Sequence, residues 1–202
     1  MPKRHPLRND NLRRALAQEA ARVMSEHGIR DYLAAKRKAA DRFGVSDGAV
    51  LPKNTEIEAA LVEYQRLFGG VSHAESLHAQ RSAALEAMRR LSSFEPRLVG
   101  SVLSGTATEH SDVQLHLFAD SPESVAITLT DQGIRHEVTA RRVKMNADRV
   151  LECPGVRFEI AEQAIEATVF PADGIRQAPA SPVDGRPMRR ADLSELEELL
   201  ED

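Results

Sequence analysis

The pattern of apolar residues changes at residues 94–96, and this change restricts the possible folds more than any other feature of the sequence. Before it, apolar residues recur three and four positions apart, which is the period of an amphipathic helix. After it, they form short runs separated by turn residues, as is typical of β-strands. The sequence therefore predicts the α+β class, with a helical N-terminal region over residues 1–93 and a small mixed sheet over residues 94–172.

Four helices are expected in the N-terminal region. The apolar spacing predicts two of them over residues 9–27 and 32–43, and each is followed by a glycine that can end a helix. The other two, over residues 55–68 and 72–92, begin with a serine or threonine that has a glutamate three positions later. This pattern is typical of a capping box, in which the two side chains satisfy backbone N–H groups of the first turn.

Strands and one further helix are expected after residue 94. The helix begins near Pro122 and ends at Gly133. Glu162-Gln163 predicts a hairpin turn between the last two strands, and residues 173–202 are expected to form a proline-rich loop and a short acidic helix. The expected strands are residues 97–99, 112–118, 136–145, 156–161 and 164–170.

The composition restricts the setting in which the protein works. One cysteine among 202 residues excludes an intrachain disulfide, and no apolar run approaches the length of a membrane span. We therefore expect a cytoplasmic protein with no membrane partner. Two tyrosines, six phenylalanines and no tryptophan also argue against base stacking on aromatic side chains as the main binding device.

Charge is distributed unevenly along the chain. Residues 1–40 hold ten basic and four acidic side chains, whereas residues 191–202 hold six acidic and no basic side chains. Either the two ends neutralise each other, or the basic end binds nucleic acid. In favour of DNA, the turn Gly44-Val45-Ser46-Asp47-Gly48 resembles that of tetracycline-repressor-type helix-turn-helix regulators. Pro52, however, leaves about one helical turn after it to enter a groove.

The most informative segment for chemistry is residues 98–118, LVGSVLSGTATEHSDVQLHLF. Gly100 ends a strand and lets a ligand approach the backbone, and Ser101 offers a hydroxyl and an N–H at a helix start, which suits a phosphate. On the returning strand, alternation places Asp112, Gln114 and His116 on one face and apolar side chains on the other. Packing alone does not account for three such polar residues, so we predict that this face carries the active surface.

These residues resemble the nucleotidyltransferase superfamily with the DNA polymerase beta-like fold. The family motif has the form G-S-x-x-x-G, six further residues, then D-x-(D/E), and it is matched here by Gly100-Ser101, Gly105 and Asp112. Gln114 stands where the family has its second carboxylate. The resemblance covers residues 94–170 and implies the fold of that family for this region.

The resemblance also implies a chemistry. In the family, a carboxylate triad holds two Mg²⁺ ions on a nucleoside triphosphate, an acceptor hydroxyl attacks the α-phosphorus and pyrophosphate leaves. Asp112 would be the first metal ligand, and Glu166 on a later strand is expected to be the third, with Glu159 as its rival. Gln114 can coordinate a cation but adds no charge, so the Mg²⁺ site is expected to be weaker than a carboxylate triad.

Three functions follow as hypotheses. The first is a nucleotidyltransferase that uses Mg²⁺ and an NTP such as ATP, with an unspecified hydroxyl acceptor on a nucleic acid, a protein or a small molecule. The second is a catalytically degenerate nucleotide-binding or regulatory protein, because Gln114 replaces a carboxylate. The third is a DNA-binding regulator that acts through the basic N-terminal helices. The first two share Asp112 and Glu166 as metal ligands and Gly100 and Ser101 as nucleotide contacts.

Overall fold

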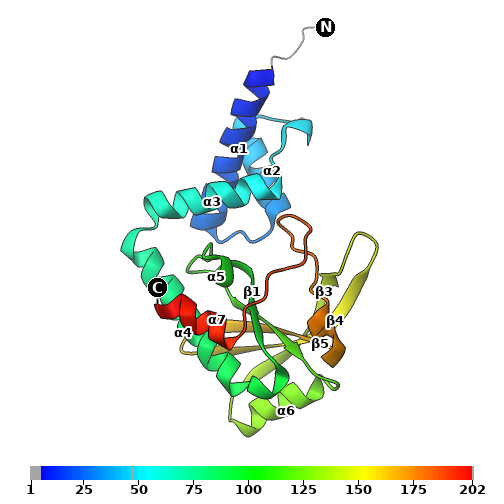
Figure 1. Cartoon of the computed structure of the whole chain (residues 1–202). Coiled ribbons are helices and arrows are strands. Elements are labelled where there is room, and N and C mark those ends of the chain that lie inside the picture. Colours follow the sequence, from blue (N-terminus) through cyan, green and yellow to red (C-terminus); the bar gives the residue numbers. More distant parts are fainter. Residues whose placement is uncertain (1–5, 47, 202) are drawn as a thin grey trace. The chain divides into compact units, whose positions relative to one another are not determined.

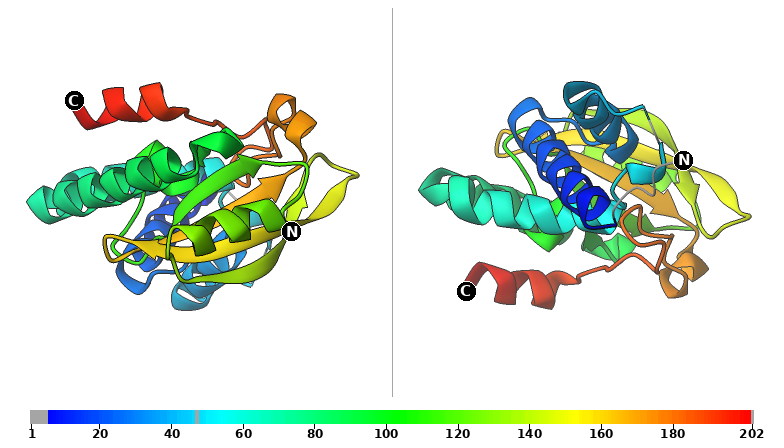
Figure 2. Two further views of the ribbon diagram at one scale, coloured as in Figure 1. Left: turned by 90° about the horizontal axis from the view of Figure 1, so that it is seen from below. Right: turned by 90° about the horizontal axis from the view of Figure 1, so that it is seen from above.

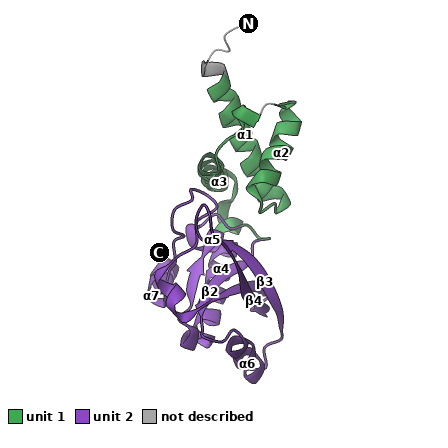
Figure 3. Cartoon of the chain, turned by 90° about the vertical axis from the view of Figure 1, so that its right-hand side faces the viewer, with its two compact units in different colours: residues 1–74, 108–110 green, residues 75–107, 111–202 purple. Residues whose placement is uncertain are grey.

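The computed structural model describes residues 6–46 and 48–201, and its α+β class is the one that the sequence predicts. The chain divides into two compact units (Figure 3). The helical unit holds residues 1–74 with 108–110, and the sheet unit holds residues 75–107 with 111–202. Within the helical unit, the Arg30 guanidinium donates to the carbonyl oxygen of His110.

The helical unit contains α1 (Pro6–His27), α2 (Tyr32–Phe43), a 3₁₀ turn η1 (Gly48–Val50) and α3 (Asn54–Phe68). The Asp31 side chain caps α2 by accepting a hydrogen bond from the backbone N–H of Ala34. Gly44 ends the same helix at φ 62°, a conformation that glycine adopts without strain. Small apolar side chains let these helices approach closely, and the buried set includes Leu16, Ala17, Ala20, Ala35, Ala39 and Ile57.

The sheet unit is built on one mixed sheet of five strands (Figure 1). In chain order these are β1 (Arg97–Val99), β2 (Val113–Phe118), β3 (His136–Lys144), β4 (Val150–Ile160) and β5 (Gln163–Phe170). Their order across the sheet is β1-β2-β5-β4-β3. The pairing of β2 with β5 is parallel, and the other neighbours are antiparallel. The sheet therefore has β2 and β5, far apart in sequence, side by side at its centre.

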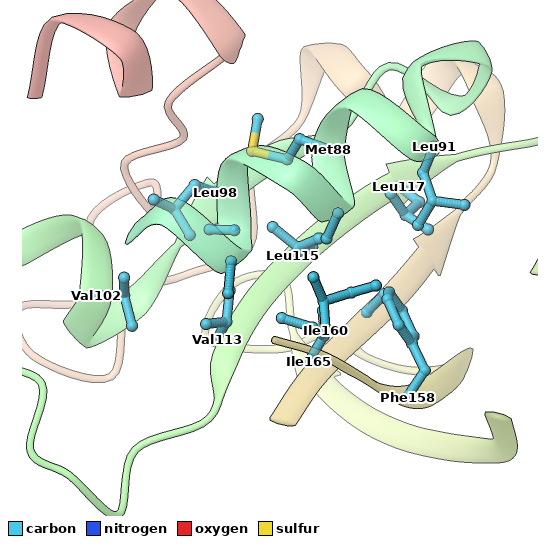
Figure 4. Close-up of a cluster of buried hydrophobic side chains, with 14 of the residues drawn as sticks. Met88, Leu91, Leu98, Val102, Val113, Leu115, Leu117, Phe158, Ile160 and Ile165 are labelled. Carbon is cyan, nitrogen blue, oxygen red and sulfur yellow. The ribbon is translucent and has the colours of Figure 1, made fainter. Parts of the chain in front are cut away.

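Helices cover one face of this sheet. They are α4 (Gly70–Arg90, of which residues 75–90 lie in this unit), α6 (Glu123–Asp131) and the terminal α7 (Leu193–Glu201). In the view from below, α6 lies in front of the sheet (Figure 2). Figure 4 shows the core between helices and strands, with Met88 of α4 and the adjacent Leu91 near Leu115 and Leu117 of β2. The acidic α7 is joined to α4 by an ion pair between Glu197 and Arg89.

Most expected elements appear close to their predicted positions, and the clearest error concerns β4. It begins at Val150, six residues before the expected start, and includes Pro154. The early part of β4 pairs with β3 alone, because β5 joins it only from Gly155 onward. A proline is tolerated there since that stretch has a neighbour on one side only. The following turn lies at Ala161 and Glu162, both at positive φ, one residue before its predicted place.

A membrane-spanning helix was not expected from the sequence. Among the residues that the structure describes, no helix combines the length and the apolar character that crossing a membrane requires.

Candidate functional site

The alternation of β2 separates a buried apolar face from a polar one. Val113, Leu115 and Leu117 are fully buried beneath the helices, so Gln114 and His116 lie on the opposite face. Asp112 immediately precedes the strand and continues this alternation. The face predicted from the sequence to carry the active surface is thus the face of the sheet without the helical core.

Parallel pairing brings the third predicted ligand to the same place. In the register of β2 and β5, Gln114 lies opposite Glu166, and His116 lies opposite Thr168. Asp112, Gln114 and Glu166 therefore gather on neighbouring strands of one face. The rival Glu159 lies on β4 opposite Ala164 of β5, which places it one strand further from β2 than Glu166. Of the two, Glu166 is the carboxylate beside β2.

Gly100 and Ser101 form the corner between β1 and the five-residue helix α5 (Gly100–Ser104). Gly100 has φ +75°, and a Cβ added there would lie 2.6 Å from Oε1 of Gln114. A side chain at residue 100 would thus displace the end of the Gln114 side chain, and the positive φ of this corner favours glycine. The Ser101 carbonyl accepts from the N–H groups of Thr106 and Ala107, which closes α5 into a tight turn. Gly100 of the motif and Gln114, which departs from the motif, are therefore neighbours in the structure.

Two arginines from the far strands reach the predicted ligands. Arg157 of β4 lies 3.7 Å from the Asp112 carboxylate, measured from Nη2 to Oδ1. Arg141 of β3 lies 2.9 Å from the Glu166 carboxylate, measured from Nη1 to Oε2. Neither arginine was predicted from the sequence to be a site residue. Arg157 lies opposite Glu166 in the register of β4 and β5, and this non-local pairing is not visible in the sequence pattern.

His116 lies deep in the same face and is 6% exposed. Arg190 donates from Nε to its Nδ1 over 3.1 Å, so Nδ1 acts as the acceptor. Burial, together with the positive charges of Arg190 and Arg141, lowers the pKa of His116 to about 3. The imidazole is therefore neutral at neutral pH, and its proton resides on Nε2.

Arg190 fastens the C-terminal loop to this face. Its Nη1 donates to the carbonyl oxygens of Gly174 and Ile175, and its guanidinium lies 4.9 Å from the ring centroid of Phe118 and 5.4 Å from that of Phe170. Burial and the charge of Arg97 lower the pKa of Arg190 to about 10, so it stays charged at neutral pH. Arg190 was not predicted from the sequence, because the proline-rich segment around it carries no periodic pattern.

The oxygen donors on this face can be tested against the Mg²⁺ that the resemblance implies. Carboxylate and amide oxygens, as in Asp112, Gln114 and Glu166, are ligands that Mg²⁺ accepts. Within the described part of the chain, no three His, Cys, Asp or Glu side chains are grouped to hold a metal ion. Mg²⁺ commonly binds through one or two carboxylates plus substrate phosphates, so two carboxylates and an amide are the types of donor that one ion shared with a nucleotide would accept. They do not supply the triad for two ions.

Comparison with protein-family models, with curated proteins and with solved structures finds no match for this chain. The resemblance to nucleotidyltransferases thus rests on the motif at residues 98–118.

Proposed function

We propose that this polar face is a nucleotide site of the nucleotidyltransferase type, which binds a nucleoside triphosphate together with Mg²⁺ and has lost most of its transfer activity. The observation that carries the proposal is the parallel register of β2 and β5, which brings Asp112, Gln114 and Glu166 onto one face beside Gly100. An NTP-binding regulatory protein is the function that these residues support best.

Each residue has a defined role in this proposal. Asp112 and Glu166 would hold Mg²⁺, with the Gln114 amide oxygen as a weaker third donor, and the ion would offset the charge of the triphosphate. Gly100 leaves room for phosphate oxygens to approach the backbone, and the Ser101 hydroxyl can donate to them. Neutral His116 can act as a hydrogen-bond donor through Nε2, but it is a poor general base because its pKa is far below neutral.

One observation favours binding over transfer. Gln114 adds no negative charge at the position where a carboxylate triad needs one. Nucleotidyl transfer is the second candidate, favoured by the close match of the motif spacing from Gly100 to Asp112. In that case an acceptor hydroxyl would attack the α-phosphorus and pyrophosphate would leave.

The DNA-binding hypothesis has less support from the helical unit. Several of its basic side chains form ion pairs within the unit, including Arg13 with Glu56 and Arg42 with Glu19. The segment after the repressor-like turn is the three-residue η1, which is too short to lie along a DNA groove as a recognition helix. We therefore place nucleotide binding first.

The role of residue 114 as a metal donor can be tested with Gln114→Glu, which keeps the length of the side chain that lies near Gly100. We expect this variant to bind Mg²⁺ about tenfold more tightly than wild type, because a third carboxylate strengthens attraction for a hard cation.

Pyrophosphate release distinguishes binding from transfer. When wild type is mixed with Mg²⁺, each of the four NTPs and a pool of RNA, protein and small hydroxyl acceptors, pyrophosphate should stay at background. Sustained pyrophosphate release by wild type that Asp112→Ala abolishes would establish transfer instead.

A further inference from the structure

We propose that Arg141 and Arg157 are exchangeable counter-ions. In the free protein they neutralise Glu166 and Asp112, and when Mg²⁺ and a nucleotide arrive together they move from the carboxylates to the phosphates. This inference rests on the proposed function and deepens it. It states how the site couples its two ligands and assigns the phosphate contacts to residues outside the sequence motif.

The burial of the two ion pairs is asymmetric in the way that such an exchange requires. The side chains of Arg141 and Arg157 are 37% and 53% exposed, whereas those of Glu166 and Asp112 are 20% and 10% exposed. The carboxylates are therefore held in the sheet face, while the arginines extend over them from β3 and β4. Long, half-exposed guanidinium side chains can rotate away without disturbing the strands.

The energies also permit the exchange. A partly exposed ion pair contributes little to stability, so displacing either arginine from its carboxylate costs little. A divalent cation carries twice the charge of a guanidinium and compensates the same carboxylates more strongly. The displaced guanidinium groups are well suited to phosphate, because their N–H groups match two phosphate oxygens at once.

A coupling between the two ligands follows from this arrangement. If Mg²⁺ binds alone, it displaces both arginines, and these then have no anion beside them. If a triphosphate binds alone, it draws the arginines away, and Asp112 and Glu166 then lose these two cations. When the two bind together, every charge finds a partner. By thermodynamic reciprocity, each ligand then raises the affinity for the other by the same factor. The site therefore favours the Mg²⁺ complex of a polyphosphate over either component.

The test compares Arg141→Gln and Arg157→Gln with Arg142→Gln by calorimetry. Arg142 is the matched control because it neighbours Arg141 on β3, points to the other face by alternation and is exposed. The probes are Mg²⁺ alone, ATP in EDTA and Mg²⁺ with ATP. Each site variant should bind Mg²⁺ alone about threefold to fivefold more tightly and ATP in EDTA at least about tenfold more weakly, and the control should stay within about twofold of wild type.

These measurements distinguish failure of the arginine exchange from failure of the proposed function. If wild type binds Mg²⁺ with ATP but the Arg141 and Arg157 variants bind Mg²⁺ alone no more tightly than wild type, the exchange is wrong and the proposed function stands. If wild type binds no Mg²⁺ with ATP, both proposals fail. Thermal unfolding of each variant, expected to be within a few degrees of wild type because the arginines are half-exposed, verifies that the fold is retained.

Discussion

Replacing Arg190 with methionine is expected to lower the free energy of unfolding of the sheet unit by about 3 kcal/mol. Methionine keeps the length and apolar character of the side chain but removes its donors. The Nδ1 of His116 and the carbonyl oxygens of Gly174 and Ile175 would then lose the N–H groups that reach them, and the cation over two phenylalanine rings would be lost. Each buried acceptor left without a donor costs about 1–3 kcal/mol. Removing the positive charge of Arg190 also removes the free-energy cost of burying it, which offsets part of this loss of stability.

Hydrogen exchange of the β2 and β5 amides measures this effect in the sheet unit itself. The matched control is Arg186→Met in the same loop, because the side chain of Arg186 is 84% exposed and its contact with Asp184 is long, at 3.9 Å. The control should stay within about 0.5 kcal/mol of wild type. If the Arg190 and Arg186 variants proved equally stable, the contacts that fasten the loop to the sheet face would not hold in solution.

Replacing Gly155 with alanine should destabilise the sheet unit by about 2–3 kcal/mol. A Cβ at this position would lie 2.7 Å from the backbone oxygen of Ala167 and 2.9 Å from Oγ1 of Thr139. The first neighbour is backbone in the adjacent strand and cannot rotate away. The strands must therefore move apart at the point where Gly155 pairs with both Thr139 of β3 and Thr168 of β5.

The control for Gly155→Ala is Gly48→Ala in η1, where an added Cβ meets nothing within 4 Å and φ is not positive. Chemical denaturation followed by circular dichroism, with hydrogen exchange to assign the transition to the sheet unit, gives both values. Gly48→Ala should be nearly neutral. A Gly155→Ala protein as stable as wild type would show that β4 and β5 do not pair in this register.

Much of the fold could be predicted from the sequence because its local signals agree with one another. The helix of residues 32–43 was predicted with both ends correct, since Asp31 and Gly44 cap it, and β1 was predicted over its full length of residues 97–99. The early start of β4 could not be predicted. Pro154 argues against a strand locally, and only its one-sided pairing with β3, a non-local fact, makes it tolerable.

In the candidate site, too, the local features could be predicted from the sequence and the non-local ones could not. Alternation along β2 was sufficient to place Asp112, Gln114 and His116 on one face, because it is a local property of a strand. The positions of Arg141, Arg157 and Arg190 depend on the order of the strands and on the path of the loop after β5. Two of these arginines face carboxylates from other strands, and no spacing in the sequence encodes such a contact.

The central claim is that Asp112 anchors a Mg²⁺-dependent nucleotide site, and calorimetry of ATP with Mg²⁺ against wild type and Asp112→Ala tests it most directly. Asp120→Ala is the matched control, because this exposed aspartate lies just beyond the other end of β2. The proposal predicts that wild type and the control bind equally and that Asp112→Ala loses at least about tenfold in affinity, since one of two carboxylate ligands is gone. Equal binding by all three proteins, or no binding by wild type, would contradict it.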